Sequence, residues 1–439
     1  MNRICMLTMF LFLLVSCGNR NAGKEQRETT ASLEKQGASV ETFAADYRPP
    51  AGIKYQPTIV RTGAKTINVA AALKHVRALK ANEIGTPMLY PTGVEALCIF
   101  GSPLLKVENK WVLQAIEGLY LLDNKYKAVR QLVRNDVEME SEDGKNISLN
   151  LKRFLYDAGY DASLRQLRAS YGGKSRRFIA NLSWDELLAS TDTCTPDQLT
   201  DLLPQPAKGK FYTMEGGYFS PERFSSRVYT FGTKGDTLCL FTVNDAEDYV
   251  PVGDYRSAER DGQVYVYGGK PRFLLGYDDT VYELEDASTL KAVWKLDFGD
   301  LKRPTGKYVV ESLSRNLGDY WFINSFMETD RYVIMGLSEG HDCPSNRESN
   351  NVKLYTLVYN KQTAECFSLP PAKNKEGHPD YPQIPFTYQG KSLNDHLSGV
   401  VDGIPYFLTY GKKLKEQLAG VPEAEALGEK ETVIVMVEQ

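Results

Sequence analysis

The sequence predicts an all-β protein, a β-propeller of about six to eight blades with six favoured, carrying a small helical insertion. Three observations support this fold. Short runs rich in Tyr, Phe, Val and Thr alternate with tight turns from about residue 55 onward. These hairpins are too numerous for one flat sheet, which would leave long open edges. The chain also closes with a strongly apolar strand, Thr432 to Val437, of the kind that seals a ring.

The N-terminal residues predict export and a lipid anchor. Arg3 precedes a short apolar run, and residues 14–17 (Leu-Val-Ser-Cys) match a lipobox, so residues 1–17 are interpreted as a lipoprotein signal peptide with lipidation at Cys17. The run is shorter than the roughly 20 apolar residues that a spanning helix needs. An ordinary cleaved signal with a chance Cys is the alternative. We expect a cell-envelope protein, lipid-anchored to the outer membrane on its periplasmic or its surface face.

The rest of the chain divides into a tether and one domain. Residues 18–50 are polar and poor in large apolar side chains, so they predict a flexible tether. Residues 51–439 are assigned to the propeller domain, with the helical insert near residues 149–203.

Hairpins follow one another along this domain. Each consists of two β-prone runs around a turn of Gly, Asn or Asp residues. They are found at residues 118–133, 227–243, 264–284 and 353–369. Units of this kind recur roughly every 40 to 50 residues in propellers, which gives the blade number above.

Helix signals concentrate in the middle of the chain. Ser183 begins one capping box and Thr195 begins a second, with Pro at its first helical position, so two short helices are predicted between Ser183 and Leu203. Residues 149–170 are a candidate for another helix. Residues 69–81 are Ala-rich and fit either a helix or a strand with a loop.

Ring closure requires a partner for the C-terminal strand. In a closed ring, the last strand pairs with one from the start of the domain. The candidate partner is the segment Pro57 to Arg61.

Two segments resemble a known family. Residues 278–304 contain an Asp-Thr-Val-Tyr strand, Trp294, then Leu-Asp-Phe-Gly and Pro304. Residues 400–418 contain Asp-Gly, an apolar stretch and a Lys/Leu-rich helix, with Ile404 where the second Gly is expected. Both are similar to six-bladed β-propeller lipoproteins of Bacteroides-type bacteria, a largely uncharacterised family. The resemblance implies the fold and the compartment, and it implies no activity.

Residues 336–340 (Gly-Leu-Ser-Glu-Gly) match the nucleophile motif of hydrolases. A strand precedes Ser338, but the following residues predict a loop rather than a helix, and no His and Asp elsewhere have the required order. We therefore interpret residues 336–351 as a long loop between strands.

Composition excludes several other functions. The net charge is -4 and no basic stripe occurs, so no nucleic-acid partner is expected. Four scattered His residues without H-E-x-x-H, and the lack of a phosphate-binding loop, predict no catalytic residue, no metal ligand and no cofactor. A structural or central-channel divalent ion such as calcium stays an open alternative. Seven Cys residues include no C-x-x-C, and their pairing cannot be read from the sequence.

Two functions compete. The first is a non-catalytic lipoprotein that binds a glycan or protein partner through propeller loops, with loop aromatics at Tyr218, Phe219, Tyr277 and Tyr381. For each of these, packing within or at the edge of a blade is the plainer interpretation.

The second is a propeller enzyme, a glycan lyase or hydrolase or a metal-assisted lyase, that uses acids at the central face. Asp278 and Asp279 are the first candidates, followed by Asp297 and Asp402. Asp278 and Asp279 are also assigned to the ligand-binding set, although ordinary turn chemistry explains them as well.

Overall fold

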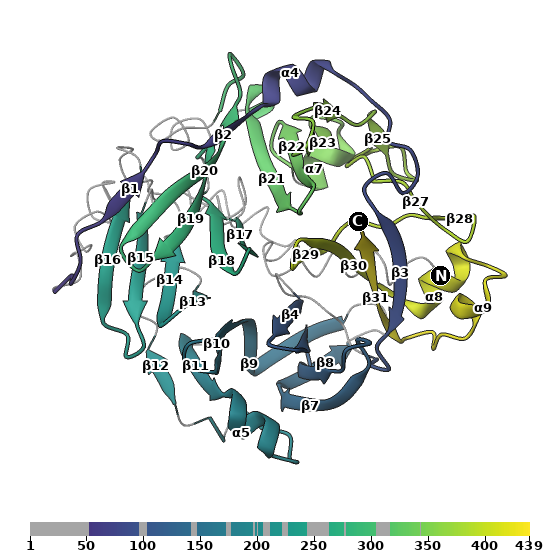
Figure 1. Ribbon diagram of the computed structural model, residues 1–439. Coiled ribbons are helices and arrows are strands. Elements are labelled where there is room, and N and C mark those ends of the chain that lie inside the picture. Colours follow the sequence, from purple (N-terminus) through teal and green to yellow (C-terminus); the bar gives the residue numbers. More distant parts are fainter. Residues whose placement is uncertain are drawn as a thin grey trace, which may run out of the picture.

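Six antiparallel sheets stand around one axis in the computed structural model, which confirms the predicted six-bladed propeller (Figure 1). The structure describes residues 52–95, 103–141, 147–172, 177–195, 198–199, 201–204, 211–221, 227–243, 263–275, 278–303, 317–342 and 344–439. We number the blades 1 to 6 along the chain and letter their strands A to D from the axis outward. The A–B and C–D turns share one face of the ring, which we call the AB face.

The strands follow the chain in blade order. Blades 1 and 2 contain β4 (Leu104–Val107), β5 (Lys110–Ala115), β6 (Gly118–Leu122), β7 (Ala128–Arg134), β9 (Ile147–Asp161), β10 (Gln166–Gly172), β11 (Arg177–Ser183) and β12 (Leu202–Pro204). Blades 3 and 4 contain β13 (Tyr212–Met214), β14 (Gly217–Pro221), β15 (Arg227–Gly232), β16 (Thr237–Thr242), β17 (Gln263–Tyr267), β18 (Lys270–Leu274), β19 (Thr280–Asp286) and β20 (Thr289–Asp297). Blades 5 and 6 contain β21 (Trp321–Glu328), β22 (Tyr332–Glu339), β23 (Lys353–Asn360), β24 (Cys366–Ser368), β29 (Gly399–Val401), β30 (Ile404–Tyr410), β31 (Thr432–Glu438) and β3 (Thr86–Pro91).

The four predicted hairpins are all present. Residues 118–133 form β6 and β7, 227–243 form β15 and β16, and 353–369 form β23 and β24. Residues 264–284 form three consecutive strands, β17 to β19.

The predicted helix over residues 149–170 is wrong. These residues belong to β9 and β10, which pair with each other. The first part of β9 also pairs with β8 (Asp136–Ser141), so an additional hairpin precedes blade 2. The spacing of Leu, Tyr and Phe along this stretch is compatible with both a helical and a strand periodicity, and pairing with the neighbouring strands stabilises the sheet.

Ring closure occurs, but with a different partner from the predicted one. Strand β31 pairs antiparallel with β3, with Leu89 opposite Val435, so the chain start supplies the outermost strand of the last blade. The predicted partner, β1 (Thr58–Val60), instead runs parallel to β20 on the edge of blade 4. A segment nearer the N-terminus therefore covers another blade before the chain reaches its closing position.

The segment between residues 54 and 91 forms an outer strap. The backbone N–H groups of Lys54 and Tyr55 bond to Leu238 O on blade 3, at 3.0 and 2.8 Å. Next, β1 and β2 (Lys65–Asn68) pair with β20, and Val76 bridges Ser368 on blade 5. The strap thus covers exposed strand edges, which would otherwise be open to pairing with another chain.

Helices are few and short. They are α4 (Val69–Lys74), α5 (Trp184–Ala189), η2 (Leu317–Asp319), α7 (Pro344–Glu348), α8 (Gly411–Gln417) and α9 (Pro422–Glu425). Helix α5 begins at the predicted capping box, where Ser183 Oγ accepts from Glu186 N at 3.3 Å. The second predicted helix falls partly outside the described residues, and its end at residues 202–204 is strand β12. Two small hairpins, β25 (Ala372–Lys373) with β26 (Pro379–Asp380) and β27 (Phe386–Tyr388) with β28 (Lys391–Leu393), precede blade 6.

The core lies between neighbouring blades, and strand β22 illustrates why. Its Tyr332 and Ile334 pack in a cluster shared with blade 6, whereas Val333, Met335 and Leu337 pack in a cluster shared with blade 4. A strand covered on both faces is apolar at nearly every position. No helix among the described residues is long and apolar enough to cross a membrane.

Candidate functional site

The predicted loop aromatics Tyr218 and Phe219 do not lie in a loop. Both belong to strand β14 and are buried, at 1% and 0% exposure. Tyr218 packs on Phe231 with ring centroids 5.1 Å apart, and Phe219 contacts Phe273 of the next blade at 5.7 Å. The prediction of loop aromatics at these two positions is wrong, because the turn at Gly216 ends before β14 and both rings enter the crevices beside the blade.

Tyr381 is half-buried and engaged in a polar network. Its hydroxyl donates to Asp342 Oδ2 at 3.0 Å, and Arg347 bonds both oxygens of Asp342 at 2.5 and 2.8 Å. Arg347 also lies over the Tyr381 ring, 5.5 Å from its centroid. These contacts give Tyr381 a structural role. Tyr277 and Cys17 lie outside the described residues.

The candidate acids Asp278 and Asp279 hold the turn before β19. Asp278 Oδ1 accepts from the N–H groups of Asp279 and Thr280 at 2.7 and 3.1 Å, whereas its buried Oδ2 has no partner among the described residues. Burial raises the pKa of Asp278. Asp279 pairs with the buried Arg303 at 2.8 Å. The two carboxylates thus have different structural partners.

Of the two remaining acids, Asp297 lies beside this turn, because the N–H of the preceding Leu296 donates to Asp279 O at 2.7 Å, whereas Asp402 lies in another blade. Asp297 is exposed at the end of β20, where its Oδ1 accepts from Gly299 N at 2.9 Å. Asp402 occupies the A–B turn of blade 6. Among the described residues, no three His, Cys, Asp or Glu side chains gather as a metal site.

Ser338 lies on a strand and not in the predicted loop. Ser338 is not on a nucleophile elbow either. It lies within β22, between paired β21 and β23, and is fully buried. Asn324 Nδ2 donates to Ser338 Oγ at 2.8 Å. The short helix α7 does follow, contrary to the prediction, but a buried serine on an inner strand of a four-stranded sheet cannot meet a substrate.

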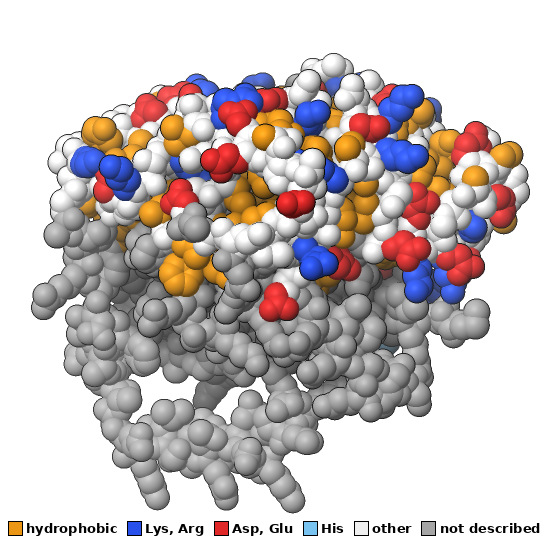
Figure 2. Space-filling view, turned by 90° about the horizontal axis from the view of Figure 1, so that it is seen from below, with side chains coloured by type: hydrophobic (Ala, Val, Ile, Leu, Met, Phe, Trp, Pro, Cys, Tyr) orange, Lys and Arg blue, Asp and Glu red, His pale blue; other side chains and the backbone are white. Residues whose placement is uncertain are grey.

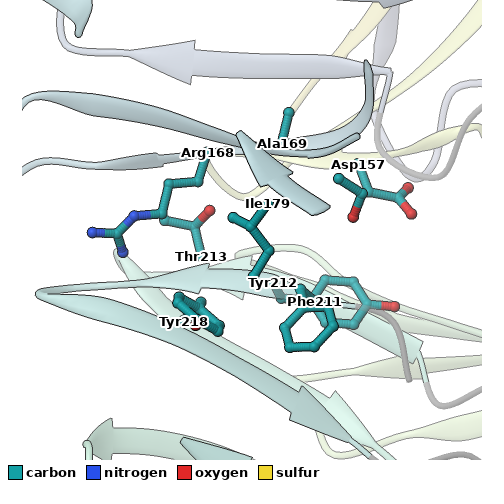
Figure 3. Close-up of a pocket in the computed structure, with 9 residues that line it drawn as sticks. Asp157, Arg168, Ala169, Ile179, Phe211, Tyr212, Thr213 and Tyr218 are labelled. Carbon is teal, nitrogen blue, oxygen red and sulfur yellow. The ribbon is translucent and has the colours of Figure 1, made fainter. Parts of the chain in front are cut away.

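A polar crevice between blades 2 and 3 is the first candidate site (Figure 3). Arg168 on β10 is 3% exposed and pairs with the fully buried Asp161 at 3.0 Å. Arg168 also donates through Nη1 to Gly217 O, which links the two blades. Opposite Ala169, β9 contains a bulge in which Asp157 has φ 50°. Bulges and left-handed residues of this kind often occur beside functional sites.

The size of this crevice argues against a ligand larger than water. Arg168 Nε and Nη2 and the Tyr218 hydroxyl face no hydrogen-bond partner among the described residues. Burial lowers the pKa of Arg168 and raises that of Tyr218 to about 12. The cavity volume is only about 10 Å³, enough for roughly one water molecule. In Figure 3, Arg168 and Asp157 lie on opposite sides of the cavity, with Ile179 between them. We therefore interpret this crevice as part of the packing contact between blades 2 and 3, and not as a ligand site.

A second candidate, on the AB face, joins the last blade to the first. We call it the seam cluster, and it consists of Tyr90, Lys106, Trp111, Tyr126, Asp402 and Glu438. Tyr126 lies with its ring centroid 4.8 Å from Tyr90 and 4.8 Å from Trp111. All three rings are half-buried. They rest on a buried apolar cluster shared by blades 6 and 1.

The backbone fixes the position of Tyr126. Its φ of 62° is left-handed, a region that tyrosine seldom adopts. The turn is held by Asp123, whose Oδ1 accepts from the N–H groups of Lys125 and Lys127 at 2.8 and 2.9 Å. Strain of about 1 kcal/mol is the usual cost of such a residue. The turn thus keeps the ring against its neighbours from the last blade.

Charged groups surround the three rings. Glu438 Oε1 accepts from the Tyr90 hydroxyl at 3.0 Å, and Lys106 pairs with Asp402. The Lys106 ammonium lies 5.7 Å from the centre of the Trp111 ring, its cross-strand neighbour. Burial, followed by nearby Tyr90, Glu438 and Asp402, raises the pKa of Tyr126 to about 12, so the phenol stays protonated.

Sequence reasoning missed this cluster. Asp123, Asn124 and Lys125 lie between the two β-prone runs of the predicted hairpin at residues 118–133, and Tyr126 directly follows them, so an aromatic residue beside a turn is the available signal. Its neighbours could not be found in this way. Tyr90 and Glu438 are 348 positions apart, and only ring closure brings them together.

Comparisons with known proteins agree with the fold. A family model described as "Domain of unknown function (DUF4933)" matches residues 50–420. No curated protein sequence matches the chain.

The solved structures that are similar to the chain include two from Bacteroides species. One, from Bacteroides fragilis, is described as a "putative exported protein"; it is 12% identical, covers 86% of this chain and 98% of its own, and has a TM-score of 0.51. Another, a member of the duf4221 family from Bacteroides vulgatus, is 9% identical, covers 82% and 96%, and has a TM-score of 0.39. At such identity, the first likeness supports the fold alone.

Proposed function

The chain belongs to the DUF4933 family, and from this basis we propose that it is a non-catalytic binding protein of the cell envelope. Its partner is a glycan or a protein, which docks on the AB face at the seam cluster. The observation that carries this proposal is the position of Tyr126. A tyrosine in a left-handed turn is held beside two other half-buried rings, at the junction of the first and last blades.

The chemistry of the cluster supports binding. Trp111 Nε1 and the Tyr126 hydroxyl make no hydrogen bond to any described residue, so both are free to bond a partner. Trp and Tyr are common anchors at binding surfaces because each offers a large rigid area and a polar end. Rigid strands and short turns position all six side chains, which lowers the ordering cost of binding.

The enzymatic alternative has less support. Its four candidate acids are each engaged in a structural contact: Asp278 and Asp279 hold one turn, the neighbouring Asp297 accepts from Gly299 N, and Asp402 of another blade pairs with Lys106. A two-carboxylate mechanism needs both groups to flank one bond, within about 10 Å of each other. No observation on the described residues gives any pair of these acids that arrangement around an open site.

The proposal includes the lipid anchor at Cys17 and the tether over residues 18–50. Metabolic labelling with a fatty acid should mark the wild-type chain and not Cys17→Ser, which should move from the membrane to the soluble fraction. Labelling of Cys17→Ser equal to wild type would contradict the anchor. Protease added to intact cells then decides between the surface and periplasmic faces.

Binding is tested with the purified full chain in detergent, against glycan arrays and envelope proteins from the same cells. Trp111→Ala should weaken the principal interaction at least tenfold. Tyr355→Ala is the matched control, since Tyr355 is another half-buried tyrosine against a tryptophan, 5.0 Å from Trp321 in blade 5. Equal loss in both variants, or retention of binding by Trp111→Ala, would contradict the seam cluster as the binding surface.

A further inference from the structure

We infer that the ligand of the seam cluster is a neutral carbohydrate with free hydroxyl groups; this inference rests on the proposed function and decides between its two classes of partner. Three features of the cluster favour a sugar over a protein. They are unused carboxylate oxygens, unused donors on the aromatic rings, and a charged rather than apolar border.

The unused acceptors belong to Glu438 and Asp402. Each carboxylate is held by one oxygen: Glu438 Oε1 by the Tyr90 hydroxyl at 3.0 Å, and Asp402 Oδ2 by Lys106. No described residue bonds to Glu438 Oε2 or Asp402 Oδ1. A carboxylate oxygen accepts two hydrogen bonds, and sugar hydroxyls are donors that match such fixed acceptors. Because one oxygen of each carboxylate is hydrogen-bonded, the other oxygen has a fixed orientation. Little side-chain entropy is therefore lost when a ligand binds.

The unused donors belong to the rings. The Trp111 indole N–H is a donor only, and the Tyr126 hydroxyl both donates and accepts. Sugars present axial C–H groups on one face and hydroxyls at the edge. A half-buried ring with a polar end matches both parts of such a molecule. The seam cluster therefore combines apolar contact area, donors and acceptors within one group of side chains.

The border of the cluster argues against a protein partner. The cores of protein interfaces are depleted of charged residues, and docking patches on monomers extend over several hundred Å² of apolar surface. Here Lys106 and Asp402 are 42% and 47% exposed directly beside the rings. Figure 2 shows the same character on the side of the ring that it views, where charges of both signs lie among small hydrophobic areas.

The charge balance selects among sugars. Asp402 and Glu438 contribute two negative charges, and Lys106 contributes one positive charge that Asp402 already neutralises. The turn that holds Tyr126 adds Asp123, Lys125 and Lys127, so the site and this turn together carry no net charge that would attract an acidic chain. The remaining carboxylate of Glu438 repels acidic sugars. A neutral chain is thus expected to bind better than a uronic-acid or sulfated chain of the same length.

The test uses isothermal titration of the full chain in detergent with soluble neutral glycans (mannan, dextran, arabinogalactan and xylan) and acidic glycans (polygalacturonate and chondroitin sulfate). We expect at least one neutral glycan to bind tenfold or more tightly than either acidic one. Trp111→Phe and Glu438→Gln should each weaken it at least fivefold. Glu339→Gln is the matched control, because Glu339 accepts from Tyr355 beside Trp321 at 3.3 Å and should leave affinity within twofold. Circular dichroism of each variant verifies the fold.

The outcomes separate this inference from the proposed function. If an envelope protein binds, Trp111→Phe weakens it and no neutral glycan binds, the carbohydrate inference is overturned and the proposed function stands. If neither glycan nor protein binding responds to the seam variants, both fail. Preference for an acidic glycan that weakens in Trp111→Phe overturns the neutral class alone.

Discussion

A buried charge network between blades 4 and 5 provides the sharpest test of how the ring holds together. Glu328 at the end of β21 is 1% exposed and accepts three bonds: from Arg272 Nη1 at 2.7 Å, from Tyr265 OH at 2.7 Å and from Lys361 Nζ at 2.9 Å. Tyr265 and Arg272 belong to blade 4, whereas Lys361 and Glu328 belong to blade 5. We predict that Glu328→Gln, which keeps the shape and removes the charge, destabilises the ring.

The magnitude follows from what each partner retains. Removing one member of a buried ion pair costs about 3–5 kcal/mol, because the other charge remains buried. Arg272 still has Glu283, at 2.5 Å, and Lys361 still has Thr329 O, at 2.9 Å, so the lower end applies. Unfolding entropy near 2.1 cal/mol/K per residue over the roughly 320 residues that the structure describes gives about 0.7 kcal/mol/K. A loss of about 3 kcal/mol therefore lowers Tm by about 4 °C.

The effect should depend on pH in a defined direction. Burial alone would raise the pKa of Glu328, but the bonds and charges of Arg272 and Lys361 outweigh it and hold the pKa below its usual value. A carboxyl with a lowered folded pKa stabilises the protein above its unfolded pKa, about 4.3. This stabilisation disappears as the pH falls through the folded value. The gap between wild type and Glu328→Gln should accordingly narrow below about pH 4.

Differential scanning calorimetry of both proteins at several pH values measures this gap. Glu285→Gln is the matched control, since Glu285 is about one-third exposed and lies 3.8 Å from Lys291, a geometry that contributes little. A Tm for Glu328→Gln within 1 °C of wild type at pH 7, or a gap that persists undiminished at pH 3, would refute the reasoning.

Two further predictions concern buried polar groups. Asp278 has a pKa raised by burial, so its ionisation opposes folding increasingly as the pH rises above about 4. The Tm of Asp278→Asn minus the Tm of wild type should therefore be larger at pH 7 than at pH 4. A Tm difference that does not change with pH would contradict this prediction. Arg168→Met removes the ion-pair partner of the buried Asp161, which keeps hydrogen bonds from Ser163 and Leu164, so a cost of about 3 kcal/mol is expected in urea unfolding. The double variant with Asp161→Asn should recover part of this loss, and equal stability of the single and double variants would disprove the coupling.

The fold could be predicted from the sequence because its repeating element, the hairpin, is formed by residues that are adjacent in the chain. Hairpins such as β6–β7 and β15–β16 are specified by adjacent runs and the turn between them, and six blades built from such hairpins follow one another along the described residues. Pairing between strands that are distant in the sequence was harder to predict. The choice of β3 over β1 as the closing strand depends on how many residues the strap needs to pass two blades, which no local pattern encodes.

The candidate site was less predictable for a related reason. In a propeller, each strand can be covered on both faces, so an aromatic residue after a Gly-Gly pair, such as Tyr218, enters the crevice instead of solvent. Ser338 is buried by the same geometry, within a strand that continues to Glu339, four residues into the predicted loop of residues 336–351. Exposure in this fold is decided by distance from the blade ends rather than by the neighbouring sequence.

The position of the seam cluster links recognition to ring closure. Tyr90 lies on the first strand of the closing pair and Glu438 at the end of the other, while Trp111 and Tyr126 come from the next blade. The complete set of side chains therefore exists only when β3 and β31 are paired. A ligand that binds this set and not the opened ring stabilises the closed form by about 2.7 kcal/mol at a concentration 100 times its Kd. Because β31 is buried along nearly its whole length, opening is costly, and closure supplies the rigid frame that the cluster requires.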